Sequence, residues 1–166
     1  MPFLKIDKGL EAEANGCQLM KPIPGPDALL ARGGGGIFGT KERSVISAAG
    51  MPKDQGRRGA AVRAGRAGSL AHGLIPIIEP EVTISIADKA EAEAILRDEI
   101  LARLDALPGR PAGHAEADPA DAANFYKPVD HPRDEGRGAV GRLQPRRGER
   151  ASLAQNTGII ACSAVP

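Results

Sequence analysis

The sequence predicts an α/β fold in which parallel strands alternate with helices. Residues 74–82, LIPIIEPEV, form an apolar run without polar alternation, which is typical of a strand covered on both faces of its sheet. Residues 87–109 follow with apolar side chains at helical spacing and end at a Pro-Gly pair, which indicates a helix. Because strand, polar end and helix recur along the chain, the strands are expected to pair in parallel.

Three shorter elements are expected upstream of this unit. A buried strand fits residues 2–7, PFLKID, before the turn residues Lys-Gly. A short helix fits 26–32, PDALLAR, and a short strand fits 33–41, where Ile37 and Phe38 precede a polar end.

The strand at 74–82 contains two prolines, and the helix at 87–109 has a candidate N-terminal capping residue. Pro76 and Pro80 donate no ladder hydrogen bond, so they are expected near a strand edge or end. Asp88 is placed to cap the helix, and acidic residues follow in its early turns.

Composition limits the classes of function. The 166 residues suffice for one ordinary domain, and a net charge of +1 gives no global field for nucleic acid or an anionic membrane. Cys17 and Cys162 lie far apart, which fits a reducing cytoplasm better than a disulfide scaffold. No stretch reaches the roughly 18 apolar residues of a membrane-spanning helix, and aromatic residues make up only 2% of the chain.

Several other features are weak candidates for a site. The Arg- and Gly-rich stretches 53–69 and 133–150 have no apolar periodicity, and they could contact phosphates. The glycine run at 33–36 lacks the Gly-Lys-Ser/Thr of a phosphate loop and favours a flexible turn. The three histidines share no ligand spacing, so surface histidines are a better interpretation than a zinc site.

Three polar clusters come directly after strand-like runs. They are Lys5, Asp7 and Lys8, then Lys41 and Arg43, and then Glu79 and Glu81. In parallel α/β sheets the reactive groups gather at the carboxyl ends of the strands, where neighbouring cations and carboxylates adjust one another's protonation. The alternative is that these are solvated loop charges, which spacing alone does not exclude.

A set of sequence blocks resembles one enzyme family. The blocks are PFLKIDKGL…NGCQLMKPI, IFGTKERSVI, GLIPIIEPEV…DKAEAEAIL and NFYKP…DHP, and they cover most of 1–46 and 71–107, together with 121–133. In this order and spacing they are similar to the bacterial branch of class I fructose-bisphosphate aldolase. The resemblance implies a (β/α)₈ barrel and a lysine Schiff base, with no metal and no cofactor.

The resemblance also implies roles for individual residues. Lys5 and Asp7 would end the third barrel strand near a substrate phosphate or hydroxyl. Lys41 and Arg43 would close the fourth strand, with Lys41 assisting proton transfer and Arg43 binding phosphate. Glu79 would end the fifth strand as the proton acceptor, with Glu81 beside it.

The sequence departs from the family pattern in three places. The match begins at the family's third strand, so a partial barrel lacking the first strands is expected. The block VMLKLT that carries the Schiff-base lysine is replaced by GHAEADPA at 113–120, where Glu116 stands near the place of the amine. The phosphate loop resembling LSGGYSR is also missing. A carboxylate cannot form an imine, so the chain as printed is expected to be inactive.

A shifted reading frame accounts for these departures. One set of codons for GHAEADPA, read one base later, encodes VMLKLTLP, and residues 134–150 likewise yield a block containing LSGGYSR. We therefore expect one partial barrel domain over residues 1–166, in which 53–69, 108–120 and 133–166 are disordered or out of frame.

Together these observations predict reversible Schiff-base cleavage of fructose 1,6-bisphosphate to dihydroxyacetone phosphate and glyceraldehyde 3-phosphate in glycolysis. The expected partner is this sugar phosphate in the cytoplasm, with no nucleic acid or membrane, and the sequence leaves the oligomeric state open. The alternative is a non-enzymatic, Arg/Gly-rich nucleic-acid-binding protein that contains aldolase-derived segments.

Overall fold

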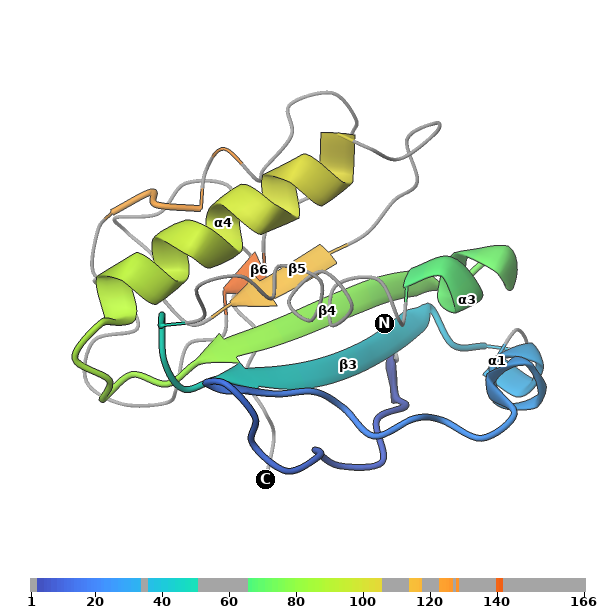
Figure 1. Ribbon diagram of the computed structural model, residues 1–166. Coiled ribbons are helices and arrows are strands. Elements are labelled where there is room, and N and C mark those ends of the chain that lie inside the picture. Colours follow the sequence, from blue (N-terminus) through green and yellow to red (C-terminus); the bar gives the residue numbers. More distant parts are fainter. Residues whose placement is uncertain are drawn as a thin grey trace, which may run out of the picture.

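The computed structural model describes residues 3–33, 36–50, 66–105, 114–117, 123–126, 128 and 140–141, and these form a mixed α/β fold around one sheet (Figure 1). Its strands are β1 (Phe3–Lys5), β2 (Cys17–Gln18), β3 (Gly39–Ile46), β4 (Ile75–Val82), β5 (His114–Ala117) and β6 (Val140–Gly141). Its helices are α1 (Pro26–Gly33), α3 (Arg66–Ala71) and α4 (Lys89–Asp105).

The sheet is parallel along its main path, in the order β1-β3-β4-β5-β6. Strand β2 is off this path and pairs with β3 in the antiparallel sense. Figure 1 shows α4 running back along the sheet, opposite in direction to β4, which immediately precedes it. The predicted α/β class with parallel pairing is therefore confirmed.

The two faces of the sheet differ because side chains alternate along each strand. The face we call the helix face carries Thr40, Glu42, Ser44 and Ile46 of β3, and Ile78 and Val82 of β4, which pair with Glu42 and Ile46. The opposite face, which we call the site face, carries Lys41, Arg43 and Val45 of β3 together with Ile77, Glu79 and Glu81 of β4.

Two apolar clusters pack the helices against the helix face. The larger cluster joins Ile46 and Val82 to the buried side of α4, formed by Ala92, Leu96 and Ile100. The smaller cluster joins Ile6 and Leu74 to Leu30 of α1. A buried hydrogen bond of 2.7 Å between the hydroxyl groups of Thr40 and Ser69 connects β3 to α3. The helices are therefore fixed on the side of the sheet that the charged clusters do not occupy.

Asp88 performs a different task from the one expected of a helix cap. It directly precedes α4, and its carbonyl accepts the amide of Ala92, as an N-terminal capping residue requires. Its side-chain Oδ2, however, accepts a hydrogen bond of 2.6 Å from the amide of Ala49, 39 residues upstream. The carboxylate thus ties the loop after β3 to the start of α4.

Four predicted elements agree with the structure to within a few residues. The strand expected at 2–7 is β1, the helix at 26–32 is α1, the strand at 74–82 is β4, and the helix at 87–109 is α4. The Pro-Gly pair predicted to end that last helix lies outside the described residues.

The strand expected at 33–41 is displaced. Strand β3 spans Gly39–Ile46, so the predicted polar end lies inside the strand. The reason is that charged and small polar residues alternate there between two faces, and a half-polar strand gives no apolar run.

The prediction of a strand edge or end is met in part: β4 is flanked by β3 and β5 and is not an edge strand, whereas Pro76 is its second residue and lies at its end. The amides of Ile75 and Thr83 donate toward β3, so those of the even-numbered residues point the other way. Pro76 and Pro80 are both even-numbered, and among the described residues β5 pairs with β4 at Ile77 and Ile78. The prolines therefore remove no hydrogen bond from the β3–β4 ladder.

Regular elements also occur in ranges from which none was predicted. Helix α3 begins within 53–69, β5 lies within 108–120, and β6 lies within 133–150. The remainder of these ranges, and residues 151–166, lie outside the described part of the chain.

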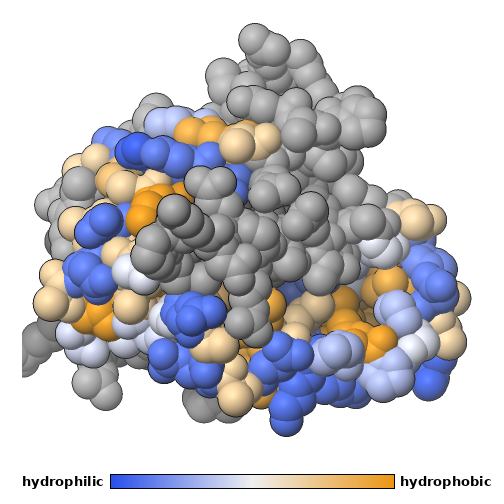
Figure 2. Space-filling model, in the orientation of Figure 1, coloured by the Kyte–Doolittle hydropathy of each residue, from blue (hydrophilic) through white to orange (hydrophobic). Residues whose placement is uncertain are grey.

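The surface of the described residues is mixed in character. In the view of Figure 2, hydrophilic and hydrophobic side chains are interspersed, and Ile84, 72% exposed, is a large apolar side chain open to solvent. Within the described ranges, no helix combines the length and apolar character needed to cross a membrane.

Gly39 is required by the close approach of β3 to β4. A Cβ at this position would overlap the backbone carbonyl of Ile75 and lie 2.7 Å from the ring of Phe3. We expect Gly39→Ala to lower the free energy of unfolding by about 3 kcal/mol, because a backbone atom cannot move aside. Urea denaturation measures this, with Gly50→Ala as the matched control, since a Cβ at Gly50 meets no atom within 4 Å. Equal stability of the two variants would show that the strands are not this close.

Candidate active site

The site face brings together side chains from β1, β3 and β4. In the parallel register, Lys5 pairs with Lys41, Lys41 pairs with Ile77, and Arg43 pairs with Glu79. Because paired residues project to the same side of a sheet, cations of β1 and β3 face carboxylates of β4. The grouping that the sequence predicted for these three strands is therefore present.

The central contact is an ion pair between Lys41 and Glu79. Lys41 Nζ lies 3.2 Å from Glu79 Oε1, and the Glu79 side chain is 5% exposed. A carboxylate so far from solvent needs a compensating charge, and the lysine on the adjacent strand supplies it. The pair holds one carboxylate and one amine within proton-transfer reach of each other.

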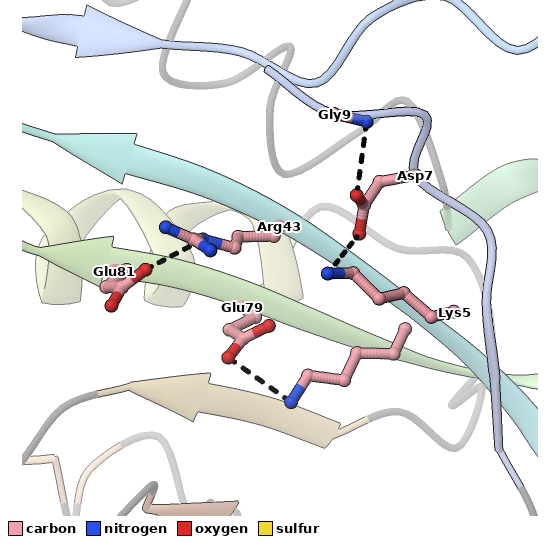
Figure 3. A network of polar contacts seen from close by, with 7 residues as sticks. Lys5, Asp7, Gly9, Arg43, Glu79 and Glu81 are labelled. Carbon is pink, nitrogen blue, oxygen red and sulfur yellow. Dashed lines mark hydrogen bonds and ion pairs between the residues drawn. The ribbon is translucent and has the colours of Figure 1, made fainter. Parts of the chain in front are cut away.

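A second pair lies toward the ends of the same strands. Arg43 Nε is 2.8 Å from Glu81 Oε2 (Figure 3). Both side chains are more exposed than that of Glu79. This contact is diagonal, since the register partner of Glu81 is Val45. It directs the guanidinium along the site face, where its planar group suits a phosphate or carboxylate.

The β1 end of the site is formed by Lys5 and Asp7. Lys5 Nζ lies 3.8 Å from Asp7 Oδ2, and Asp7 Oδ1 accepts a hydrogen bond of 3.4 Å from the amide of Gly9 (Figure 3). The Lys5 side chain is 59% exposed whereas that of Asp7 is 6% exposed, so the amine is the part that a ligand can reach.

One expectation about these residues is wrong. Lys41 and Arg43 do not close their strand, because β3 continues to Ile46, and Glu79 precedes the end of β4 by three residues. The charged side chains of β3 and β4 therefore lie along the face of the sheet, and Asp7 lies in the loop that follows β1.

The structure adds a residue that the sequence did not indicate. Glu42 lies between Lys41 and Arg43 but on the helix face, and it is 3% exposed. Burial raises the pKa of its carboxyl from 4.5 to about 7, and the negative charge of Asp7 acts in the same direction. The alternation of Thr40, Glu42, Ser44 and Ile46 could have revealed it, had residues 39–46 been recognised as a strand.

Of the weaker candidates, His72 lies apart from the site face. His72 Nε2 pairs with Asp27 at 3.2 Å and links α3 to α1 on the surface, as expected for a surface histidine. In the described part of the chain, no three His, Cys, Asp or Glu side chains are grouped to hold a metal ion. Residues 34–35 of the glycine run, His131 and most of the arginine-rich stretches lie outside the described residues.

Fold and site together define a mixed α/β protein whose parallel sheet carries helices on one face and paired cations and carboxylates on the other. Comparison with known proteins is more specific. No protein-family model matches the chain. The class 1 fructose-bisphosphate aldolase of Porphyromonas gingivalis is 42% identical over 165 residues, which cover 97% of this chain and 55% of that protein.

A second relative gives the same result. The class 1 fructose-bisphosphate aldolase of a Synechocystis species is 46% identical over 109 residues, covering 65% of this chain and 36% of that protein. The chain is therefore a relative of the class 1 fructose-bisphosphate aldolases, as its motifs indicated, and it spans about half the length or less of these two proteins. Neither comparison favours the nucleic-acid-binding alternative.

The difference in burial between the two ion pairs yields a test. A double-mutant cycle on Lys41→Met and Glu79→Gln is expected to give a coupling free energy of roughly 2 kcal/mol. The same cycle on Arg43→Met and Glu81→Gln should give about 0.5 kcal/mol, because that pair is better solvated. Urea denaturation of the single and double variants measures both values. Equal coupling energies would contradict the assignment of Lys41–Glu79 as the central contact.

Proposed function

We propose that this chain carries the substrate-binding side of a class I fructose-bisphosphate aldolase. The observation that supports this most directly is the Lys41–Glu79 ion pair, 3.2 Å long, on neighbouring parallel strands of a chain 42% identical to such an enzyme. The proposed reaction is the reversible glycolytic cleavage of fructose 1,6-bisphosphate to dihydroxyacetone phosphate and glyceraldehyde 3-phosphate.

Each site residue has a proposed task in this reaction. In a chain that carried the Schiff-base lysine, Glu79 would accept the proton of the substrate C4 hydroxyl as the C3–C4 bond breaks, and the iminium at C2 would take up the electron pair as an enamine. This chain lacks that amine, so here Glu79 would only contact the hydroxyl. Lys41 lies against Glu79 and would assist the proton transfer.

The remaining charged groups would position the two phosphates. Arg43 would bind one phosphate, with Glu81 fixing the plane of its guanidinium. Lys5 extends from the β1 end of the same face, with Asp7 accepting a substrate hydroxyl or orienting the lysine.

We further propose that the fold is part of a (β/α)₈ barrel. Consecutive parallel strands, helices confined to one face and polar side chains on the other support this, because in such barrels the helices form the outer ring. The proposed location is the cytoplasm, because two cysteines as far apart in the sequence as Cys17 and Cys162 fit a reducing compartment better than a disulfide scaffold.

Strand β5 stands where the family carries its imine-forming lysine. It pairs in parallel with β4, with Ile77 beside His114 and Ile78 beside Ala115, and Glu116 is the next residue of β5. Glu116 offers no amine to form a Schiff base. The chain as printed is therefore proposed to bind the sugar phosphate without cleaving it.

We attribute this departure to shifted reading frames within residues 53–69, 108–120 and 133–166. The expected finding in the gene is compensating single-base insertions and deletions near Arg110, Ala120, Asp134 and Arg150. A verified DNA sequence that encodes the printed residues and has no open frame one base away would contradict a sequencing error as their origin.

Ligand binding tests the proposed site. Fructose 1,6-bisphosphate is expected to bind the chain in isothermal titration calorimetry, and Arg43→Met should weaken binding by roughly tenfold through loss of a charge-assisted contact. Glu91→Gln, an exposed change on α4, is the control and should bind as the parent chain does. Absence of binding, or equal weakening by both variants, would overturn the proposal.

Restoring an amine tests the chemistry. Glu116→Lys is expected to become covalently labelled by dihydroxyacetone phosphate under borohydride reduction, whereas the parent chain should not. Mass spectrometry of the digested protein locates the label, and circular dichroism verifies that the variant has kept its fold. Labelling of a lysine in the parent chain would contradict the account of Glu116, although it would still support aldolase chemistry.

A further inference from the structure

Glu42 is a buried carboxylate to which the proposed function assigns no task. Both of its oxygens are inaccessible to solvent, and neither has a hydrogen-bond partner among the residues that the structure describes. A carboxyl group in this situation is destabilised when it is ionised, because neither water nor a hydrogen-bond donor compensates the negative charge. The neutral acid avoids most of this cost, so the protonation state of Glu42 affects the stability of the strand that carries it.

The charge that acts on Glu42 is negative, that of Asp7. The buried cation of α4 on the same side of the sheet, Lys89, is paired with the buried Glu93 at 2.9 Å. On β3 it has Thr40 and Ser44 on the same face, and on β4 its register partner is Ile78. The segment after β1 contributes Asp7, a negative charge whose own ion pair is with Lys5. From α3, the hydroxyl of Ser69 is engaged with Thr40.

Its position within β3 connects this carboxyl to the site. Lys41 and Arg43 are its immediate neighbours in sequence and project to the opposite face, where they contact Glu79 and Glu81. In a strand, a side chain can leave its face only if the local backbone turns or separates from its neighbours, and the adjacent side chains move with it. Exposure of Glu42 would therefore displace both cations of the site face.

We propose that Glu42 is a proton-sensitive switch within β3. In its neutral form, it keeps the strand seated against the helix face, with Lys41 and Arg43 held against their carboxylates. When it releases its proton to solvent, the ionised side chain favours an opened strand in which it reaches water and the two ion pairs loosen. This switch depends on the sheet alone and not on the proposed function.

The direction of the pH dependence follows from linkage. The folded-state pKa of Glu42, about 7, lies above the ordinary carboxyl value of 4.5. Between these values the folded strand binds more protons than the open one, so the stability present below the lower value is lost as pH rises through about 7. The equilibrium constant for closing of β3 should therefore fall by on the order of a hundredfold between about pH 5 and about pH 8.

Hydrogen exchange and carboxyl NMR test the switch on the whole chain without ligand. Protection factors of the β3 amides, corrected for intrinsic exchange rates, are expected to fall by that factor in the parent chain and to stay level in Glu42→Gln. Glu42→Met, which removes the carboxyl altogether, is the second variant and should also give a level profile. Glu91→Gln, on the exposed side of α4, should follow the parent chain.

Two outcomes would overturn the proposal. One is a ¹³C carboxyl resonance of Glu42 that titrates near 4.5, its ordinary value. The other is a fall in β3 protection that persists in both Glu42 variants. Because neither readout involves fructose 1,6-bisphosphate, failure of the switch is distinguishable from failure of the proposed aldolase site.

Discussion

The parallel register between β3 and β4 is the constraint on which the candidate site depends. It sets Arg43 beside Glu79 and Lys41 beside Ile77, which brings the lysine amine within 3.2 Å of the Glu79 carboxylate. A slip of one residue would turn these charges toward the apolar clusters that hold the helices. Packing and site geometry are therefore set by the same ladder, because the apolar residues that seat α4 alternate with the charged residues that meet on the opposite face.

This arrangement buries polar side chains, and their desolvation cost falls mainly on β3. Three of its helix-face residues, Thr40, Glu42 and Ser44, are polar and buried. The hydroxyl of Thr40 is hydrogen-bonded to that of Ser69, whereas Glu42 has no hydrogen-bond partner in the described part of the chain. The apolar packing of Ile46 and Val82 against α4 anchors the other end of the β3–β4 pair. Apolar packing therefore holds β3 at its Ile46 end, after the site residues. Between Lys41 and Arg43, the buried Glu42 lacks a compensating partner among the described residues, so we expect β3 to respond to protonation.

Sequence patterns predicted most of the framework and the grouping of charged side chains from neighbouring strands. The apolar run of β4 and the helical spacing of α4 are strong local signals, and polar residues after successive strands correctly implied that Lys41 and Glu79 would meet. The limits of β3 could not be read in the same way, since its charged residues were interpreted as a strand end. Burial of Glu42 depends on which face the helices occupy, and that is a tertiary property. Because Lys41 and Arg43 were interpreted as the end of a strand, the charged residues were expected at the strand ends and not on the face of the sheet.

The most direct test of this account is an NMR titration of the chain with fructose 1,6-bisphosphate, followed at assigned side-chain and backbone resonances of β3 and β4. The account predicts that the Lys41 ammonium, the Arg43 guanidinium and the Glu79 carboxyl resonances shift together with one dissociation constant. Resonances of Ile46 and Val82, which pack against α4, should change little. Shifts confined to those apolar residues, or a Glu79 resonance that does not respond while Arg43 does, would contradict the claim that this face of the sheet is the substrate site.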